Sequence, residues 1–517
     1  MGTRPWWQSA VVYQIYPRSF ADSNHDGIGD LGGVRDRLGH LAWLGVDAIW
    51  LSPFYRSPMA DFGYDVADYC DVDPLFGALD DIDGLIADAH ALGIRVVLDW
   101  VPNHTSEQHP WFVESRSGTA DPKREWYVWR DPSPSGGPPN NWRAAFSPVP
   151  AWTLDPTTGQ YYLHCFLPQQ PDLDWSNPRV VEAMHGVLRF WLDRGVDGVR
   201  IDVAHLLGKD PDLADDPPES IGLPHVVLND RPETHPILRD LRRLVDGYED
   251  DRMMVGEVYL LDVPRMAKYY GRGDELHLSF NFPALYAEWD ADCWREVIDT
   301  TTGALDPIDA WPTWVLSNHD NPRHRNRYGG SESRARAAAV LLLGLRGTPF
   351  LYAGEELGLL DAEVPPDRVV DPGGRDGCRA PIPWDDSVGH GWTTDPWLPL
   401  PPESTVRNVA HLRSNPASIL HLYRRLLEQR HASLALEQGD QTFLATPPGV
   451  LGWIRSTVGD DHRVILVNFT ASIVELGADL DPVIAEHLVL VASDGVGEGG
   501  PAPRTLGPDQ AVLLGPS

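Results

Sequence analysis

Short apolar runs alternate with amphipathic stretches along most of the chain, and this alternation restricts the fold more than any other sequence feature. The apolar runs cover residues 11–16, 48–51, 95–98, 199–201, 253–255, 314–316 and 349–351. The amphipathic stretches between them cover residues 35–44, 81–92, 180–193, 236–248 and 333–345. Short, mainly apolar runs are typical of strands buried on both faces, and their alternation with helices predicts a parallel sheet.

Carboxylate and histidine side chains stand at the ends of four predicted strands, in segments 99–104, 198–202, 256–257 and 317–320. In a closed barrel of eight parallel strands, functional side chains gather at the carboxyl ends of the strands. No glycine-rich nucleotide-binding loop follows the first predicted strand, which disfavours an open doubly wound sheet. About eight strands with polar groups at their ends therefore predict an α/β fold of the (β/α)8, or TIM, barrel type.

At 517 residues the chain is too long for one hydrophobic core, and two regions depart from the barrel pattern. Residues 103–174 are rich in proline, glycine and aromatic residues with little helical periodicity, which predicts an inserted, loop-rich domain after strand 3. From residue 432 the pattern changes to alternating strands, including 464–467 and 488–491, which predicts a C-terminal antiparallel β-sandwich. We expect the barrel to consist of residues 1–102 and 175–431, and the last domain of residues 432–517.

Composition restricts which partners and which cellular location we expect for the protein. A formal charge of −33 disfavours nucleic acid, because phosphate binding requires clustered basic side chains. No run approaches the roughly 18 apolar residues of a membrane helix, and no signal peptide is visible, so we expect a cytoplasmic protein, monomeric or homodimeric. The four cysteines have no metal or redox spacing. We assign no chemistry to the three lysines, Lys123, Lys209 and Lys268.

Asp202 and Glu257 follow successive predicted strands and form a candidate catalytic pair. A retaining glycosidase needs two carboxyl groups about 5 to 5.5 Å apart, one as nucleophile and one as acid/base. Arg200 lies two residues before Asp202, so both side chains point to one face of the strand, where the cation would keep Asp202 ionised. The alternatives are a structural ion pair for Arg200 and Asp202, and an exposed loop position for Glu257.

His104, His319 and Asp320 also follow predicted strands, where they would suit hydrogen bonds to sugar hydroxyls. A third carboxylate, Asp320, could bridge two hydroxyls and favour a distorted ring. Taken singly, a histidine is more often a buried side chain with satisfied hydrogen bonds than a ligand. Their shared placement after strands favours the functional interpretation.

These segments resemble the signature regions of glycoside hydrolase family 13, the α-amylase family, in its oligo-1,6-glucosidase/α-glucosidase branch. The likeness covers essentially the whole chain, including residues 12–20, 170–175 and 374–381. The resemblance implies a barrel domain, an insertion after the third strand and a C-terminal β-domain. It also implies double-displacement hydrolysis with retention of anomeric configuration.

The resemblance implies roles for individual residues. Asp202 matches the nucleophile, Glu257 the general acid/base and Asp320 the transition-state stabiliser. The residues that match the first sugar subsite are Arg200, His104, His319, Asp61, Tyr64, Phe166 and Arg379. In this match Tyr64 stacks under the glucose, and Asp61, paired with Arg379, grips its non-reducing end. For Phe166, a packed core ring is the alternative. Such a blind pocket implies exo-cleavage of short α-glucoside oligosaccharides.

The segment 22–30 has the oxygen donors of a calcium loop in Asp22, Asn24, Asp26 and Asp30, with Gly27 at the sharp turn. A complete EF-hand would carry Glu where this chain has a glycine at position 33, and no entering helix precedes the loop. Similar loops in this branch bind one structural Ca2+ or Mg2+, which implies the carbonyl of Ile28 as a further ligand. The alternative is a solvated acidic turn. We expect the metal to take no part in catalysis and no organic cofactor to be needed.

Val203, directly after the predicted nucleophile, resembles the valine that accompanies α-1,6 preference in this branch, although Ala204-His205 departs from that pattern. We therefore expect α-1,6 or mixed linkage preference with some transglucosylation. One alternative is a glucosyl rearrangement enzyme of the trehalose synthase or sucrose isomerase type, for which the arginine-rich segment 322–327 is suggestive. Another is a non-catalytic, transporter-associated subunit of the same fold, which the retained carboxylates disfavour.

Overall fold

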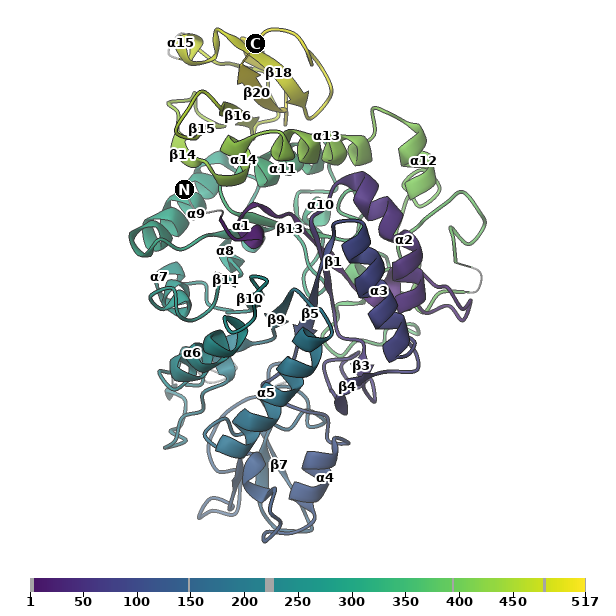
Figure 1. The fold of residues 1–517 in the computed structure, drawn as a ribbon, viewed down its shortest axis with the longest axis vertical. Helices are drawn as coiled ribbons and strands as arrows, with labels where there is room; N and C mark the ends of the chain where they lie inside the picture. Colours follow the sequence, from purple (N-terminus) through teal and green to yellow (C-terminus); the bar gives the residue numbers. More distant parts are fainter. Residues whose placement is uncertain (1–3, 147–148, 219–226, 393–394, 478–479, 517) are drawn as a thin grey trace.

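Eight parallel strands form the central sheet of the computed structural model, which describes residues 4–146, 149–218, 227–392, 395–477 and 480–516 (Figure 1). In spatial order they are β11 (Leu278–Ser279), β10 (Met253–Gly256), β9 (Gly198–Ile201), β5 (Arg95–Trp100), β2 (Ala48–Leu51), β1 (Val12–Ile15), β13 (Thr348–Tyr352) and β12 (Thr313–Val315). All neighbouring strands pair in parallel. Thr313 of β12 donates its hydroxyl to the carbonyl of Ser279 in β11 at 2.7 Å, which brings the two end strands together. The predicted (β/α)8 barrel is confirmed.

Helices cover the outside of the barrel, chiefly α2 (Leu31–Leu44), α3 (Leu79–Ala91), α5 (Pro178–Asp193), α6 (Thr234–Val245), α9 (Ala291–Leu305) and α11 (Glu332–Gly344). Their starts follow the local sequence: Asp30 accepts from the Gly33 amide to cap α2, and Asn177 caps α5 ahead of Pro178. One core lies inside the barrel, and a larger one lies between the strands and these helices. Among the helices in the described ranges, none is both long and apolar enough to cross a membrane.

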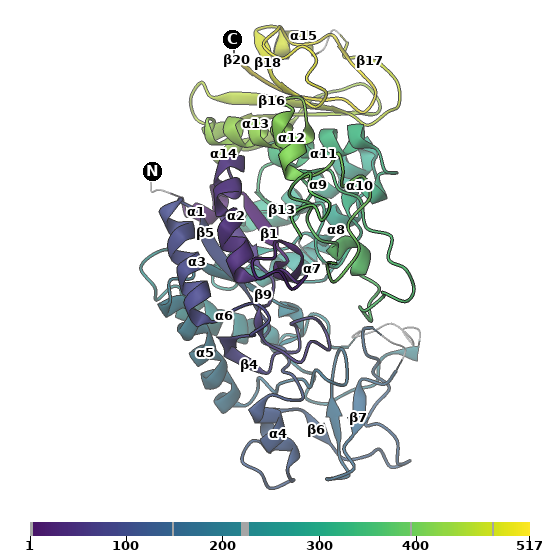
Figure 2. The same cartoon turned by 90° about the vertical axis from the view of Figure 1, so that its right-hand side faces the viewer.

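The chain leaves the barrel after β5 to form a small domain and returns to it at α5. This insertion contains α4 (Pro110–Arg116) and an antiparallel sheet of β6 (Trp129–Arg130), β8 (Tyr161–Leu163) and β7 (Trp152–Leu154). Aromatic packing holds it together, since the rings of Phe112 and Trp129 stack with centroids 5.7 Å apart. Figure 2 shows the insertion at the end of the molecule opposite the C-terminal domain.

The C-terminal domain is antiparallel, as predicted. Its main sheet has the order β14 (Asp440–Phe443), β15 (Val450–Ser456), β16 (His462–Asn468), β20 (Ala511–Pro516) and β18 (His487–Ala492), and β17 (Val474–Glu475) pairs with β19 (Thr505–Leu506) in a second sheet. A separate apolar cluster that includes Val464, Leu506 and Leu514 fills this domain. It packs on the barrel through α11, α13 (Ile419–His431) and α14 (Leu434–Gln438).

The remaining short elements belong to loops around the barrel and the C-terminal sheet. They are α1 (Trp6–Ser9), β3 (Tyr55–Arg56), β4 (Asp68–Val72), α7 (Val263–Ala267), α8 (Phe282–Tyr286), α10 (His324–Arg327), α12 (Val409–Ser414) and α15 (Asp481–Ile484).

Candidate active site

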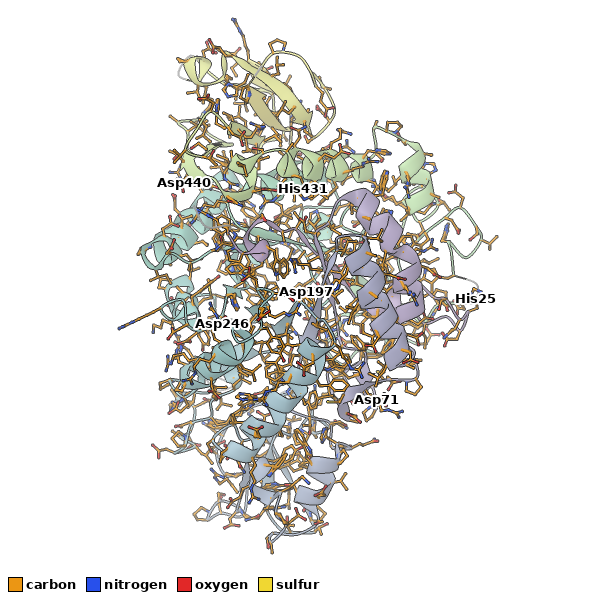
Figure 3. The ribbon with its side chains drawn as sticks, in the orientation of Figure 1. His25, Asp71, Asp197, Asp246, His431 and Asp440 are labelled. Carbon is orange, nitrogen blue, oxygen red and sulfur yellow. The ribbon has the colours of Figure 1, made fainter. Side chains whose placement is uncertain are left out.

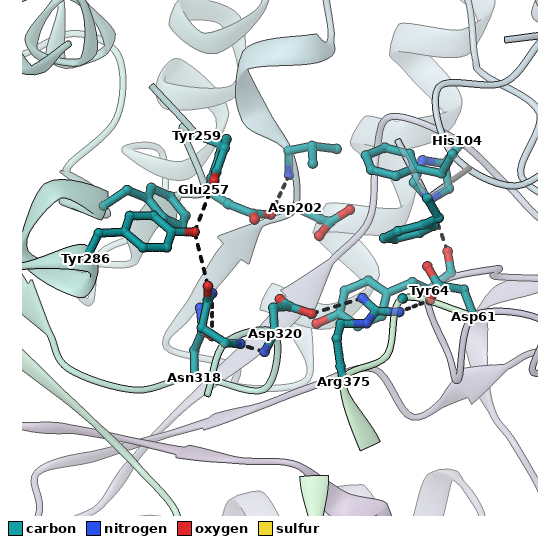
Figure 4. A pocket seen from close by; sticks show the side chains of 16 residues that line it. Asp61, Tyr64, His104, Asp202, Glu257, Tyr259, Tyr286, Asn318, Asp320 and Arg375 are labelled. Carbon is teal, nitrogen blue, oxygen red and sulfur yellow. Dashed lines mark hydrogen bonds and ion pairs between the residues drawn. The ribbon is translucent and has the colours of Figure 1, made fainter. Parts of the chain in front are cut away.

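A pocket of about 290 Å3 opens at the carboxyl ends of the barrel strands (Figure 4). Its lining residues are Asp61, Tyr64, His104, Phe146, Phe166, Asp202, Val203, Glu257, Tyr259, Phe282, Tyr286, Asn318, Asp320, Asn321, Gly373 and Arg375. Seven of these were predicted from the sequence. The other three predicted side chains, Arg200, His319 and Arg379, lie behind the wall and contact lining residues.

The register of the barrel strands places Asp202 and Glu257 next to each other. Ile201, the last residue of β9, pairs with Gly256, the last residue of β10. The residues that follow therefore leave the two neighbouring strands at the same height, and the Glu257 amide donates to the Ile201 carbonyl at 2.9 Å. Figure 4 shows the two carboxyl groups facing the same space, with Asp320 across from them.

Arg200 joins three carboxyl groups beneath the pocket. One terminal nitrogen, Nη1, donates to Asp202 Oδ1 at 2.6 Å and to Asp99 Oδ1 at 2.7 Å, and Nη2 donates to Glu257 Oε2 at 2.5 Å. Because the nitrogens of a planar guanidinium adjoin each other, the carboxyl groups of Asp202 and Glu257 lie side by side. This is the arrangement that a double displacement at one sugar carbon requires.

Asp99 and Asp202 are both buried beside this single guanidinium, and burial disfavours their charged forms. Burial raises the pKa of Asp99 to about 6, although Arg200 opposes the shift. Burial also raises the pKa of Asp202 well above its ordinary value, again against the attraction of Arg200. Burial thus favours the protonated forms of these two carboxyl groups, and Arg200 supplies the opposing attraction that a nucleophilic Asp202 carboxylate needs.

Asp320 has the opposite electrostatic setting. Burial alone would raise the pKa of its carboxyl group, but His319, Arg375 and Arg379 hold that pKa well below the usual range. Arg375 Nη1 and Arg379 Nη2 reach Asp320 Oδ1 at 3.0 and 3.1 Å. Asp320 is therefore a fixed anion, which is what stabilisation of positive charge on a sugar ring requires.

An ion pair between two lining residues, Asp61 and Arg375, lies at one end of the pocket, on the side of Asp61 in Figure 4. Asp61 Oδ1 accepts from Arg375 Nη2 at 2.6 Å, and its other oxygen accepts from Gln170 Nε2 at 3.0 Å. The expected pairing of Asp61 with Arg379 is wrong. Arg379 belongs to the short helix η7 (Asp376–Arg379), which turns its fully buried side chain toward Asp320 and the His319 carbonyl, whereas Arg375 precedes that helix and reaches the pocket.

Tyr64 forms the floor at this end of the pocket. Its ring stacks on that of His319, with centroids 5.5 Å apart and planes inclined by 9°. Its hydroxyl donates to Asp99 Oδ2 at 2.9 Å and lies 2.6 Å from His319 Nε2. Burial lowers the pKa of His319 to about 3, so this ring is neutral at ordinary pH. The ring of Phe166 lies 5.3 Å from that of His104, on the inserted side of the pocket.

Sequence reasoning missed the residues at the pocket mouth. Tyr259 and Tyr286 are both partly exposed, their hydroxyl oxygens are 3.0 Å apart, and the Tyr286 hydroxyl donates to Asn321 Oδ1 at 3.0 Å. Tyr259 lies two residues after Glu257, so the strand-end pattern could have indicated it. Arg375 and Phe146 come from long loops without periodicity; the segment 374–381 that carries the family resemblance contains Arg375, but the pocket role was assigned to Arg379 instead.

Asp22, Asn24, Asp26 and Asp30 of the loop 22–30 carry side-chain oxygens, the kind of ligand that Ca2+ or Mg2+ prefers. Both Asp22 oxygens accept backbone amides, from His25 at 2.6 Å and Gly27 at 2.8 Å, and Asn24 and Asp26 each accept one more. His25 marks this loop at the edge of the molecule in Figure 3. In the part of the chain that the structure describes, no three His, Cys, Asp or Glu side chains gather closely enough to hold a metal ion.

Two neighbouring carboxyl groups at the strand ends of a parallel barrel are the arrangement that a retaining glycoside hydrolase requires. The α-amylase catalytic-domain model matches residues 14–439, and the chain is a member of the α-amylase family.

Two curated relatives and one solved structure are similar over nearly the full chain. A probable alpha-glucosidase of Rhizobium meliloti is 44% identical over 90% of each chain. An oligo-1,6-glucosidase of Heyndrickxia coagulans is 39% identical over 83% of this chain and 85% of its own. The crystal structure of a trehalulose synthase, MutB A258V with Tris, has a TM-score of 0.92 at 34% identity, covering 99% of this chain and all of the other.

Proposed function

We propose that the protein is an exo-acting, retaining α-glucosidase that removes terminal α-linked glucose from short oligosaccharides. The Arg200 bridge between Asp202 and Glu257 is the observation that carries this proposal. The relatives named alpha-glucosidase and oligo-1,6-glucosidase support the substrate class. The Asp61–Arg375 pair in the pocket wall supports exo-cleavage, because such a charged pair suits hydrogen bonds to the hydroxyls of a terminal glucose.

In the first step, Glu257 donates its proton to the glycosidic oxygen while the Asp202 carboxylate attacks the anomeric carbon. The bond to the leaving sugar breaks, a glucosyl ester of Asp202 forms, and the Asp320 anion stabilises the positive charge that develops on the ring. In the second step, Glu257 takes a proton from water, which displaces Asp202. Two inversions at the same carbon release glucose with its α-configuration retained.

For linkage we propose α-1,6 or mixed preference with some transglucosylation. Val203 lines the pocket directly after the nucleophile, and the oligo-1,6-glucosidase relative supports this preference. Tyr259 and Tyr286 form an aromatic pocket mouth on which a second sugar can bind and accept the glucosyl group in place of water.

The trehalulose synthase likeness favours one second candidate, a glucosyl rearrangement enzyme. The sequence argument for that candidate was the arginine-rich segment 322–327. In the structure the arginines of this segment bind backbone carbonyls. Arg323 donates to the Ala353 carbonyl at 2.8 Å, Arg325 to the Gly358 carbonyl at 2.8 Å, and Arg327 to the Leu316 carbonyl. None of the three lines the pocket in the described part of the chain, so hydrolysis is the better supported proposal.

A panel of isomaltose, maltose, sucrose and trehalose, with products identified over time, tests the proposal. We expect free α-glucose as the main early product, and faster release from isomaltose than from the others if α-1,6 preference holds. A rearranged disaccharide as the main product would establish the second candidate. No turnover of any α-glucoside, including p-nitrophenyl α-glucoside, would overturn the proposal and favour a non-catalytic subunit.

We further propose that the loop 22–30 holds one structural Ca2+ or Mg2+ through Asp22, Asn24, Asp26, Asp30 and the Ile28 carbonyl. The donor chemistry supports it, and the loop packs at the start of α2, where the ion would add stability. Chelation should lower Tm by several degrees, and added Ca2+ should restore it. Asp26→Asn should weaken the response. An unchanged Tm in wild type with and without chelator would show a metal-free acidic turn.

A further inference from the structure

Lys209 is one of three lysines in the chain, and its side chain is only 8% exposed. Its ammonium group contacts Asp172 Oδ2 at 2.7 Å, Asn103 Oδ1 at 2.6 Å and the Leu206 carbonyl at 2.7 Å. An ammonium group has three hydrogens, so these three acceptors use its whole donor capacity.

The three acceptors come from three different loops of the active site. Asn103 follows β5 and directly precedes His104. Leu206 lies four residues after Asp202, in the short helix that follows β9. Asp172 lies where the inserted domain returns to the barrel, two residues after Gln170. One buried cation therefore ties together the loops that carry the nucleophile, the pocket histidine and the inserted wall.

Asp172 is fully buried and depends on Lys209 for its charge. Burial alone would raise the pKa of its carboxyl group, but the ammonium of Lys209 contributes most to holding that pKa below the ordinary value. Its other polar contacts include the amide of Cys165 at 2.9 Å, the thiol of the same residue at 2.8 Å and the Asn103 side-chain amide at 3.3 Å. Removing the cation that pairs with a buried carboxylate destabilises the fold by about 3 to 5 kcal/mol. The pair is therefore a fixed connection between barrel and insertion.

Short contacts lead from this pair to the sugar-binding end of the pocket. Asn103 Nδ2 lies 3.1 Å from His104 Nδ1 and 3.3 Å from Asp172 Oδ2. Gln170 Nε2 lies 3.0 Å from Asp61 Oδ2 and 3.2 Å from His104 Nε2. A shift of the insertion relative to β9 would move His104 and Gln170 away from Asp61, while leaving the Arg200 cluster in place.

We propose that Lys209 is a positioning residue. It holds the inserted domain in the position relative to β9 that completes the glucose-binding end of the pocket. It touches neither the substrate space nor the reacting carboxyl groups. Its loss should weaken binding of the sugar in the ground state and the transition state alike, which raises KM and leaves kcat nearly unchanged. This inference rests on the proposed glucosidase function and adds the residue that sets the geometry of the same site.

The test uses two variants, because Lys209→Met alone leaves Asp172 buried and uncompensated and should lower Tm strongly. The double variant Lys209→Met with Asp172→Asn removes both charges, so Tm should recover most of that loss. For isomaltose we expect KM of the double variant to rise about tenfold or more, with kcat within about threefold of wild type. Lys268→Met is the matched control, since Lys268 is exposed on the outside of the barrel.

Direct binding of glucose, measured by calorimetry, gives a readout that does not depend on turnover. The dissociation constant for glucose should rise in the double variant by about the same factor as KM and stay unchanged in Lys268→Met. A double variant with wild-type KM and wild-type glucose affinity would overturn the positioning role, as would a fall in kcat at constant KM. A wild-type enzyme that binds glucose but hydrolyses no α-glucoside would instead contradict the proposed function and leave the Lys209 comparison valid.

Discussion

Arg200 shows how one residue can be both structural and functional. The sequence left open whether its pairing with Asp202 was a simple ion pair or part of a catalytic site. The structure places the same guanidinium on Asp99, Asp202 and Glu257 at once. Such an excess of buried negative charge is destabilising, and it favours a specific use for the carboxyl groups.

Asp202→Asn should lower kcat on p-nitrophenyl α-glucoside by on the order of 10^4-fold, because an amide cannot form the glucosyl ester. Arg200 keeps its contacts with Asp99 and Glu257, so Tm should change little. Steady-state kinetics and thermal unfolding measure both quantities. A variant with more than a tenth of wild-type kcat would show that another group is the nucleophile.

Glu257→Gln should discriminate between leaving groups. A sugar leaving group needs a proton, whereas an activated aryl group departs largely without one. We expect kcat/KM for isomaltose to fall by about 10^3-fold, and that for 2,4-dinitrophenyl α-glucoside to fall at least tenfold less. Equal losses on both substrates would contradict the acid role of Glu257.

At the scale of elements, the strands that carry the catalytic groups were predictable from the sequence. The apolar runs that became β5, β9 and β10 end within two residues of the observed strand ends, because wholly buried strands leave a clear signal. β11 went unpredicted because it has only two residues, and tertiary pairing with β10 defines it. Arg375 went unpredicted because its position depends on the path of the long loop after β13.

The mouth of the pocket combines residues from two such elements, Tyr259 after β10 and Tyr286 at the end of α8, and no single segment could reveal their contact. Tyr286→Ala should remove part of the surface for the second sugar. We expect KM for isomaltose to rise severalfold and transglucosylation to decrease. Hydrolysis of α-glucosyl fluoride is the control, since fluoride is too small to reach this ring. An equal rise in KM for α-glucosyl fluoride would instead place Tyr286 in the first sugar subsite.

At the scale of the whole molecule, two adjacent carboxyl groups connect the barrel to the helix that leads into the C-terminal domain. Glu356 Oε1 accepts from the Tyr13 hydroxyl of β1 at 2.9 Å, and Glu355 Oε1 accepts from the Tyr423 hydroxyl of α13 at 3.2 Å. Both side chains are buried. Burial raises the pKa of Glu355 to about 8 and that of Glu356 to about 7, so the folded protein keeps protons here that the unfolded chain releases.

This difference makes stability depend on pH in a defined direction. Between pH 4.5 and about 7 the folded state binds the proton of Glu356 and the unfolded state does not, so this group's contribution to stability falls as pH rises and is constant above that range. Glu356→Gln keeps the Tyr13 and Gly354 contacts available without a charge. The free energy of unfolding, measured with denaturant, should therefore lose the contribution of Glu356 with rising pH in wild type but not in this variant. The difference, variant minus wild type, should increase by about 2 kcal/mol or more from pH 5 to pH 8. The control is Glu363→Gln at an exposed position, for which the difference from wild type should not change with pH. If the difference between Glu356→Gln and wild type were also constant across this range, Glu356 would already be ionised in the folded protein at pH 5.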